Sequence, residues 1–353
     1  MNATTILLVG NFLSRRGLTR QVCEELAPRL EERGRTVIQS SGRLNRGSRL
    51  ADMLWTVWHR RRDYEVAAVD VFSGPSFAWA EAVAWLLKQL DKPFVFMLHG
   101  GGLPEFAHRH PARVKRVLGW ADAVTSPSRF LSEGLMGFNS GIEVIPNAIE
   151  LPKYPFRLRD HPGPKLVWLR AFHNIYGPTL APRVLRRVQE VFPDAKLIMA
   201  GPDKDGSLAE VKTVAAEEGV FETIEFTGKV HKETVPALLD RADIFINTTT
   251  VDNLPTSVLE ALACGLCVVS TNVGGIPFLV EHGKDGFLVP PGDPDAMAAT
   301  VIRILREPGL AGKLSTNGRR KAEQFDWETV LPMWEALFES LADIGHGHER
   351  TFG

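Results

Sequence analysis

The stretch from Asp252 to Gly275, with the apolar run that precedes it, constrains the fold more than any other part of the chain. The runs Asp243–Asn247 and Cys267–Ser270 predict two short strands that are buried on both faces. Between them, the segment from Ser257 to Ala263 predicts a helix that ends at Gly265, because glycine tolerates the left-handed conformation after a helix. A buried strand, a helix and a second buried strand indicate a unit of a parallel sheet.

The start of this helix is a candidate phosphate site. In doubly wound sheets, ligands bind beyond the carboxyl ends of the parallel strands, where this turn is expected to lie. The turn contains Leu254, Pro255 and Thr256. The first N–H groups of a helix have no partner within the helix and lie at the positive end of its dipole, so the turn is suited to a phosphate group.

Strands and helices alternate along the rest of the chain, which predicts an α/β fold of doubly wound, Rossmann-like domains with parallel sheets. A chain of 353 residues is expected to form about two domains. The proline-containing segment from about 147 to 164 predicts the linker. We expect a first domain at residues 1–155, a second at 156–325, a helix at 326–345 and a polar tail at 346–353.

Composition narrows the classes of function. Lys plus Arg (41) nearly balances Asp plus Glu (42), so the chain has no bulk positive charge for nucleic-acid binding. Three cysteines provide no disulfide framework and indicate a reducing, cytoplasmic compartment. Cys264 and Cys267 have no second ligand pair nearby, so we expect small core residues rather than a metal site. The first residues predict a strand rather than a signal peptide, and no apolar run is long enough for a membrane span.

In the first half, two loops after predicted strands are candidate ligand contacts. His99 follows the strand Phe94–Leu98 and precedes three glycines, which would let a ligand approach the backbone, and an imidazole can share protons near neutral pH. The alternative is a histidine that only bonds a neighbouring carbonyl. The loop after the first strand lacks the dinucleotide fingerprint, but Gly17 permits close approach of a ligand. Arg15 and Arg16 either meet a phosphate there or are simply solvated.

A basic and aromatic helix is predicted from Arg49 to Glu65, with His59 followed by arginines to Arg62. Cations near a helix C-terminus complement the helix dipole, and we favour this structural interpretation. The alternative is a patch that contacts an anionic membrane surface.

The stretch from Asp252 to Gly275 resembles the donor-site signature of the retaining family 4 glycosyltransferases, which have the GT-B fold. In that family an acidic residue is followed, after seven residues, by Glu, and then by a Cys-Gly step, a buried strand and a Gly-Gly turn. Asp252 and Glu260 have this spacing. The resemblance implies that Glu260 holds the ribose hydroxyls of a nucleotide and that Asp252 lies against the transferred sugar. The chain departs from the family at Asp252, where Glu is usual, and at Cys267, where Pro is common.

Each of the two acids also has a structural interpretation. Ser257 and Glu260 match a capping box, in which the two side chains satisfy backbone N–H groups at a helix start. Asp252 fits an ordinary Asx turn before the helix. Under these alternatives, both carboxylates shape the chain rather than bind a ligand.

Other motifs extend the resemblance over nearly the whole chain. Arg170 and Gly177 match positions in the donor domain where the family binds the donor diphosphate with Arg and a following Lys, and Tyr176 occupies the lysine position. An arginine fork suits two phosphate oxygens, whereas tyrosine adds one neutral donor. Lys229 and Val230 match a loop that holds the base through backbone groups.

Three further features follow from the resemblance. His99 with the glycine after it is similar to the step that faces the donor sugar. Residues 324–334 are similar to the segment that crosses back to the first domain. Lys229 or Arg15 would supply the charge that Tyr176 lacks.

We therefore predict a two-domain GT-B protein that binds a nucleotide-sugar donor in the interdomain cleft and transfers the sugar with retention of configuration. No metal and no cofactor are expected, since the nucleotide-sugar is a substrate. The acceptor is a glycan, a lipid-linked sugar or a small molecule, as in polysaccharide biosynthesis, and the expected location is cytoplasmic or peripheral at the inner membrane face. The catalytic candidates are His99, Asp252 and Arg170, and the donor-binding candidates are Gly17, Arg170, Tyr176, Lys229, Val230, Leu254, Pro255, Thr256 and Glu260.

Two alternative functions stay open. A sugar-nucleotide 2-epimerase uses the same fold, but it would need acid and base groups around the sugar. The other alternative is a non-catalytic protein that binds a nucleotide-sugar and derives from a glycosyltransferase. The departures from the family at Tyr176 and Asp252 motivate this alternative.

Overall fold

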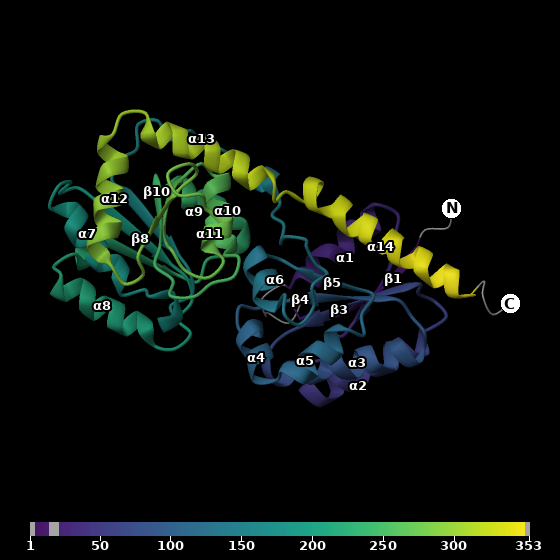
Figure 1. Cartoon of the computed structure of the whole chain (residues 1–353). Helices are drawn as coiled ribbons and strands as arrows, with labels where there is room; N and C mark the ends of the chain where they lie inside the picture. Colours follow the sequence, from purple (N-terminus) through teal and green to yellow (C-terminus); the bar gives the residue numbers. More distant parts are fainter. Residues whose placement is uncertain (1–3, 14–20, 350–353) are drawn as a thin grey trace. The chain divides into compact units, whose positions relative to one another are not determined.

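The computed structural model describes residues 4–13 and 21–349, and the chain divides into two compact units. The first unit comprises Met1–Asn147 together with Glu328–Gly353, and the second comprises Ala148–Trp327. Figure 1 shows the helices and strands of both units. Within the described ranges, no helix combines the length and apolar character needed to cross a membrane.

The first unit is built on a parallel sheet that has, among its described residues, six strands in the order β2-β1-β3-β4-β5-β6. Since β1 pairs with β2 on one side and with β3 on the other, the chain changes direction across the sheet between β1 and β3. Ligands of doubly wound sheets bind at such a switch point. The strands are β1 (Thr5–Val9), β2 (Thr36–Ser40), β3 (Val66–Val71), β4 (Phe94–Leu98), β5 (Ala123–Ser126) and β6 (Ile142–Val144).

Helices cover both faces of this sheet. One face packs against α2, α3 and α5 around a core that includes Val57, Val83 and Phe96. Figure 1 shows α1 and α14 on the opposite side of the strands from α2 and α3. Burial of one such core side chain contributes about 1.5–3 kcal/mol. The helices are α1 (Val22–Glu32), α2 (Arg46–His59), α3 (Phe77–Gln89), α4 (Leu103–Arg109), α5 (Pro111–Leu118), α6 (Arg129–Leu135), α14 (Trp327–Glu349) and the 3₁₀ turn η2 (Gly74–Ser76).

Two helices of this unit differ from their predicted bounds. α2 begins at Arg46 rather than Arg49, because the Asn45 side chain accepts hydrogen bonds from two N–H groups of the first turn and caps the helix. It ends at His59, so the following arginines lie beyond the helix. α14 continues past position 345, where the sequence predicts a polar tail.

The second unit also contains a parallel sheet, with six strands within the described part of the chain, in the order β12-β11-β10-β7-β8-β9. The chain runs outward from β7 to β9, returns to the middle and runs outward again from β10 to β12. The switch point therefore lies between β7 and β10, which pair directly. The strands are β7 (Lys165–Leu169), β8 (Lys196–Ala200), β9 (Ile224–Gly228), β10 (Ile244–Asn247), β11 (Cys267–Thr271) and β12 (Phe287–Val289).

Alternate residues of these strands enter two different cores. Leu166 and Trp168 pack in one core, and Val167 packs in the other. This is the period of two expected for a sheet covered on both faces. The covering elements are α7 (Leu180–Gln189), α8 (Ser207–Glu217), α9 (Val235–Asp240), α10 (Thr256–Ala263), α11 (Ile276–Leu279), α12 (Pro294–Arg306) and α13 (Leu310–Glu323), with 3₁₀ turns η3 (Leu151–Lys153), η4 (Asn174–Tyr176), η5 (Phe221–Thr223) and η6 (Lys232–Thr234).

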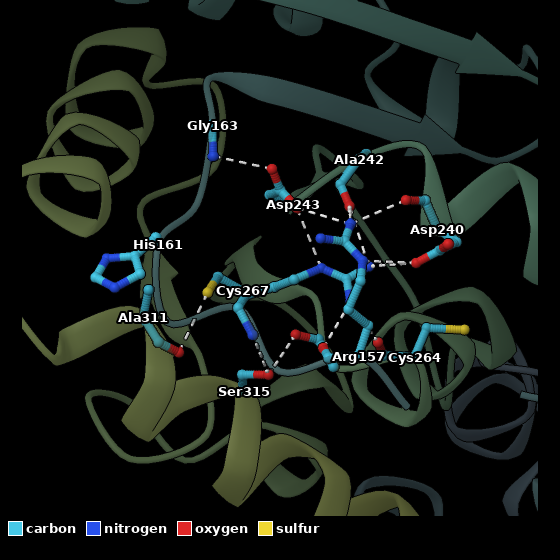
Figure 2. A network of polar contacts seen from close by, with 12 residues as sticks. Arg157, His161, Gly163, Asp240, Ala242, Asp243, Cys264, Cys267, Ala311 and Ser315 are labelled. Atoms are coloured by element: carbon cyan, nitrogen blue, oxygen red, sulfur yellow. Dashed lines mark hydrogen bonds and ion pairs between the residues drawn. The ribbon is translucent and has the colours of Figure 1, made fainter. Parts of the chain in front are cut away.

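The predicted linker is largely anchored to the second unit. Arg159 is only 1% exposed, and its guanidinium donates to the Cys264 carbonyl at 3.1 Å. Arg157 donates to the carboxylates of Asp240 and Asp243 at 2.7 and 2.8 Å, as Figure 2 shows. Because a buried guanidinium must find acceptors, these bonds hold the segment in one conformation.

Cys264 and Cys267 are buried core residues, as predicted. Cys264 follows the last residue of α10 and Cys267 begins β11. Burial raises the pKa of each thiol to about 12. Both thiols therefore stay protonated near neutral pH and act as small apolar groups.

Candidate functional site

The switch point of the second sheet brings together three of the predicted residues. Arg170 follows β7, Asp252 lies in the loop after β10, and their side chains form an ion pair. These side chains are only 14% and 13% exposed. The Arg170 guanidinium also lies over the Tyr176 ring, 4.0 Å from its centroid. A cation at this edge of the sheet is thus held between a carboxylate and an aromatic face.

Hydrogen bonds between two loops create this arrangement. The N–H of Thr250 donates to the Ile175 carbonyl at 2.8 Å, and the Thr248 hydroxyl donates to the Tyr176 carbonyl at 2.7 Å. Gly177 has a φ of +53°, and a Cβ there would lie 2.5 Å from the Thr248 carbonyl oxygen. A glycine is therefore required for η4 to pack this closely on the end of β10.

The Gly274-Gly275 turn supports the loop that carries Asp252. The Gly275 N–H donates to the Asp252 carbonyl at 2.8 Å. A Cβ on Gly275 would lie 1.7 Å from the Asn253 carbonyl oxygen, and one on Gly274 would lie 2.1 Å from the Asp252 carbonyl oxygen. Both glycines thus let one stretch of backbone lie directly against another.

Electrostatics at Asp252 balance burial against an opposite charge. Burial raises the pKa of Asp252, and the Arg170 charge and the Asn253 N–H, which act in the opposite direction, offset only part of this effect. The Asn253 N–H donates to Asp252 Oδ1 at 2.9 Å, so the carboxylate also shapes its own turn. Arg170 Nε is buried and has no acceptor among the described residues, so the guanidinium retains unused donor capacity.

Glu260 lies on α10 and accepts a hydrogen bond from the Tyr154 hydroxyl at 2.7 Å. The capping-box alternative is wrong. The helix begins at Thr256 with Pro255 before it, so Ser257 lies inside the first turn, and its hydroxyl oxygen is buried without a partner in the described chain. Since proline has no side-chain oxygen, the start of α10 lacks a side-chain cap. An anion would complement this helix terminus.

The remaining donor-binding candidates lie around these groups. Leu254 and Val230 pack against the core of the second unit. Lys229 is exposed after β9, which lies two strands from β7, or about 10 Å across the sheet. Gly17, like Arg15 and Arg16, falls outside the described residues.

His99 belongs to the first unit, where it forms a pair that the sequence did not reveal. Its Nε2 lies 2.7 Å from Oδ1 of Asp70, and its ring stacks on Phe72 with centroids 5.0 Å apart. The alternative in which His99 bonds only a carbonyl is therefore wrong. Asp70 is an acid inside the otherwise apolar strand Val66–Val71, and this interruption is the signal that could have identified it. Tyr154, the partner of Glu260, had no comparable signal.

Two family models match most of the chain. The model described as Glycosyltransferase Family 4 matches residues 3–153, and the model described as Glycosyl transferases group 1 matches residues 163–307. The chain belongs to glycosyltransferase family 4. The resemblance inferred from the spacing of Asp252 and Glu260 is thus confirmed at the level of the family.

Relatives of this family 4 chain carry several activities. It is 28% identical to the amylovoran biosynthesis glycosyltransferase AmsK of Erwinia amylovora over 293 residues, 78% of this chain and 71% of the relative. It is 30% identical to the N-acetyl-alpha-D-glucosaminyl L-malate synthase of Bacillus anthracis over 178 residues, 47% of this chain and 45% of the relative. The chain thus spans less than half the length of the Bacillus relative.

Solved structures confirm the predicted GT-B fold of this family 4 chain. The HepE protein of Anabaena in complex with UDP and glucose aligns over 96% of this chain and 100% of its own, with a TM-score of 0.74 and 17% identity. At this identity, the similarity establishes the fold alone.

Proposed function

We propose that this protein is a glycosyltransferase that transfers a sugar from a nucleotide-sugar donor to an acceptor hydroxyl. The observation that carries the proposal is the pair of Arg170 and Asp252 at the switch point of the second sheet. Asp252 lies just before the uncapped helix that carries Glu260. Cationic and helix-terminal donors at this edge suit a diphosphate, and a carboxylate suits ribose hydroxyls. The family match supports the same activity.

In this proposal the second unit holds the nucleotide. The start of α10, at Pro255 and Thr256, and the Arg170 guanidinium stabilise the charge that develops on the leaving diphosphate. Glu260 accepts hydrogen bonds from the ribose hydroxyls, and the Tyr154 hydroxyl orients it. Lys229, Val230 and Leu254 lie close to the base.

Arg170 changes partner when the donor binds. Its guanidinium pairs with Asp252, so a diphosphate must compete with this carboxylate. Once the phosphate oxygens take the guanidinium, the Asp252 carboxylate becomes available to hydroxyls of the transferred sugar. The proposal also assigns His99 to the donor sugar, as the family resemblance implies. The bond between the anomeric carbon and the diphosphate oxygen then breaks, the acceptor oxygen bonds the anomeric carbon with retention of configuration, and the proton of the acceptor hydroxyl passes to the departing diphosphate.

Tyr176 takes part through its ring rather than through charge. Where the family has lysine, this chain places an aromatic face under Arg170, at 4.0 Å from the ring centroid to the guanidinium carbon. A cation over an aromatic ring is stabilised by about 0.5–2 kcal/mol. The ring thus orients one cation instead of adding a second. We propose that no metal is required, since the arginine and the helix terminus provide the positive charge.

The acceptor in this proposal is a glycan or a lipid-linked sugar of polysaccharide biosynthesis, reached at the inner face of the cytoplasmic membrane. Three tryptophans on α2 and α3 support a peripheral membrane contact: Trp55, Trp58 and Trp85 are 62%, 48% and 55% exposed. Arg61 lies over the Trp58 ring at 4.4 Å, which places positive charge beside the aromatic surface. Exposed aromatic and cationic side chains favour an anionic bilayer surface.

Flotation with vesicles tests this contact. The variant W55A/W85A should lose binding to vesicles that contain anionic lipid, whereas the matched variant F278A, an exposed aromatic of the second unit, should retain it. Equal flotation of both variants would rule out the membrane face and favour a small-molecule acceptor.

A non-catalytic binding protein is the second candidate function. The observation that favours it is the Arg170–Asp252 pair itself, because the guanidinium that the family uses for the diphosphate already has an anionic partner. Donor turnover that exceeds that of an R170A variant would exclude this candidate.

Calorimetry with UDP, GDP, ADP and their sugars tests the donor site. We expect micromolar binding of one nucleotide, which E260A abolishes and which the exposed-surface control E222A leaves unchanged. If binding survives in E260A, Glu260 does not hold the ribose. If no nucleotide binds the wild type, the proposed transferase activity is wrong.

A further inference from the structure

The Asp70 carboxylate occupies an unusual place in the first unit. It lies on β3, all of whose residues are buried, and its own side chain is 3% exposed. Oδ1 meets the His99 ring, whereas Oδ2 is buried without a regular hydrogen bond in the described part of the chain. Its polar neighbour is the Cys23 thiol, a weak donor whose pKa is raised by burial and by the Asp70 carboxylate. An incompletely satisfied buried carboxylate costs several kcal/mol in real proteins. Core packing alone would favour an apolar residue here.

The neighbouring backbone leaves room for this carboxylate. Gly10 follows β1, the strand beside β3, and a Cβ on Gly10 would lie 2.2 Å from Asp70 Oδ2 and 2.8 Å from Cys23 Sγ. The φ of Gly10 lies outside the left-handed region, so its backbone does not by itself require glycine. The glycine instead provides the space that Asp70 fills at the switch point of the first sheet.

The pair determines which ring nitrogen of His99 carries the proton. An ionised carboxylate only accepts hydrogen bonds, so Nε2 of a neutral imidazole must donate to Asp70 Oδ1. Nδ1 then presents its lone pair. Nδ1 has no hydrogen-bond partner among residues 4–13 and 21–344, and the side chain is 13% exposed. Stacking on Phe72 fixes the plane of the ring.

We propose that Asp70 is a positioning residue that holds His99 in the Nε2–H tautomer, so that Nδ1 accepts a hydrogen bond from a hydroxyl of the transferred sugar. The tautomer follows from the first unit alone. The sugar hydroxyl as the ligand rests on the proposed function. Specificity follows from the chemistry, because a donor sugar that lacks this hydroxyl would leave Nδ1 unpaired.

Nitrogen NMR of protein labelled with ¹⁵N-histidine tests the tautomer directly. At alkaline pH, where the imidazole is neutral, the wild type should show His99 with a protonated Nε2 and an unprotonated Nδ1, with H99Q identifying the resonances. D70N should mix the two tautomers, because asparagine can accept through oxygen or donate through nitrogen. The exposed-surface control D91N should leave the resonances unchanged. A wild-type Nδ1–H tautomer, or one unaffected by D70N, would overturn the proposal.

Donor turnover tests the functional consequence. D70N should lower kcat by about ten- to a hundred-fold, by analogy with the loss that follows removal of the carboxylate partner of a metal-binding histidine. In the H99Q background, D70N should cost nothing further, because the two residues act as one unit. Additive losses in the double variant would mean that Asp70 acts independently of His99 and would overturn the proposal.

The two proposals fail in different ways. Binding of the nucleoside diphosphate found by calorimetry should be unchanged in D70N, because that ligand is assigned to the second unit. If no nucleotide binds, the proposed function is lost but the NMR result still decides the role of Asp70. If the nucleotide binds and the tautomer does not depend on Asp70, this inference alone is wrong.

Discussion

The two sheets have similar parallel topologies, yet their switch points hold different chemistry. In the second unit, Arg170 forms an ion pair with Asp252 and lies over the Tyr176 ring, and threonine hydroxyls join the neighbouring loops. In the first unit, Asp70 is part of a strand and holds His99 by one hydrogen bond of 2.7 Å. Each sheet thus has a switch point at which a ligand site can form, and the side chains there determine which ligand the site can bind.

The two sites use their carboxylates differently. Asp252 lies in a loop and neutralises a cation that a phosphate can also neutralise, so its partner is replaceable. Asp70 lies in a strand beside Gly10, where no side chain larger than hydrogen fits, and its partner is a ring nitrogen. We therefore expect substitutions in the second unit to change ligand binding, and substitutions in the first unit to change orientation.

The largest effect is expected from Arg170. R170A should reduce donor turnover by about 10²–10³-fold, the usual loss when a donor to developing negative charge is removed. The matched variant R303A removes an exposed arginine that pairs with Glu307 and should leave turnover unchanged. Steady-state kinetics measure both. Equal turnover of R170A and wild type would mean that the charged site of the second unit is structural.

A large effect is also expected from the glycine turn that supports Asp252. G275A places a methyl group 1.7 Å from the Asn253 carbonyl oxygen, so the loop must move, at a cost of about 1–3 kcal/mol. Urea denaturation measures this loss, and nucleotide calorimetry should show weaker binding. G137A is the control, since nothing lies within 4 Å of the added Cβ. Unchanged nucleotide binding in G275A would separate the loop from the site.

A moderate effect distinguishes the ring of Tyr176 from its hydroxyl. Y176F keeps the face under Arg170 and should bind the donor as the wild type does, whereas Y176L should weaken binding by about 0.5–2 kcal/mol. Calorimetry with the donor nucleotide decides between them. If Y176F loses as much affinity as Y176L, the hydroxyl rather than the ring is the functional group.

The smallest effect concerns the pH dependence of stability. The pKa of Asp252 is raised by burial, so the folded state binds this proton more tightly than the unfolded state. The stability of the wild type relative to D252N should therefore rise as pH falls through this raised pKa, and level off below the ordinary value of 3.8. Denaturation of the two proteins across this range measures the difference.

Asp205 provides a contrast of opposite sign. Hydrogen bonding from the Asn174 N–H lowers the pKa of Asp205, so its contribution is present above the ordinary value and is lost as pH falls through the lowered pKa. The stability of the wild type relative to D205N should thus decrease as the pH is lowered. The same sign for both aspartates would contradict the assignment of Asp252 as a buried carboxylate.

Much of the second unit could be predicted from the sequence, because its signals are local. The apolar run around β10, the glycines at 265, 274 and 275 and the spacing of Asp252 and Glu260 are read along one continuous stretch. Hydrophobic periodicity and glycine conformation depend on a few neighbouring residues, so both signals can be interpreted without knowledge of the tertiary packing. The parallel sheets, the family and the buried cysteines followed from the same kind of evidence.

The partners of the functional groups could not be predicted, because they come from distant parts of the chain. Glu260 is bonded to Tyr154, and His99 to Asp70, across 106 and 29 positions of sequence. The capping-box alternative matched a local pattern that the fold did not use, since α10 begins one residue earlier than predicted, at Thr256. A local motif indicates which residues are candidates for a function, and tertiary packing determines which contacts these residues make.

The two parallel sheets, the family and the residues at the strand ends could be predicted from the amino-acid sequence alone. These depend on the period of burial and on backbone freedom, which are properties of neighbouring residues. The contacts of Arg170 with Asp252 and Tyr176, and the contact of Asp70 with His99, depend on the tertiary structure. Arg170 and Asp252 meet because β7 and β10 end side by side at the switch point of the second sheet, and Asp70 and His99 meet because β3 and β4 are neighbours in the first sheet. The order of strands, rather than the order of residues, therefore sets which side chains meet.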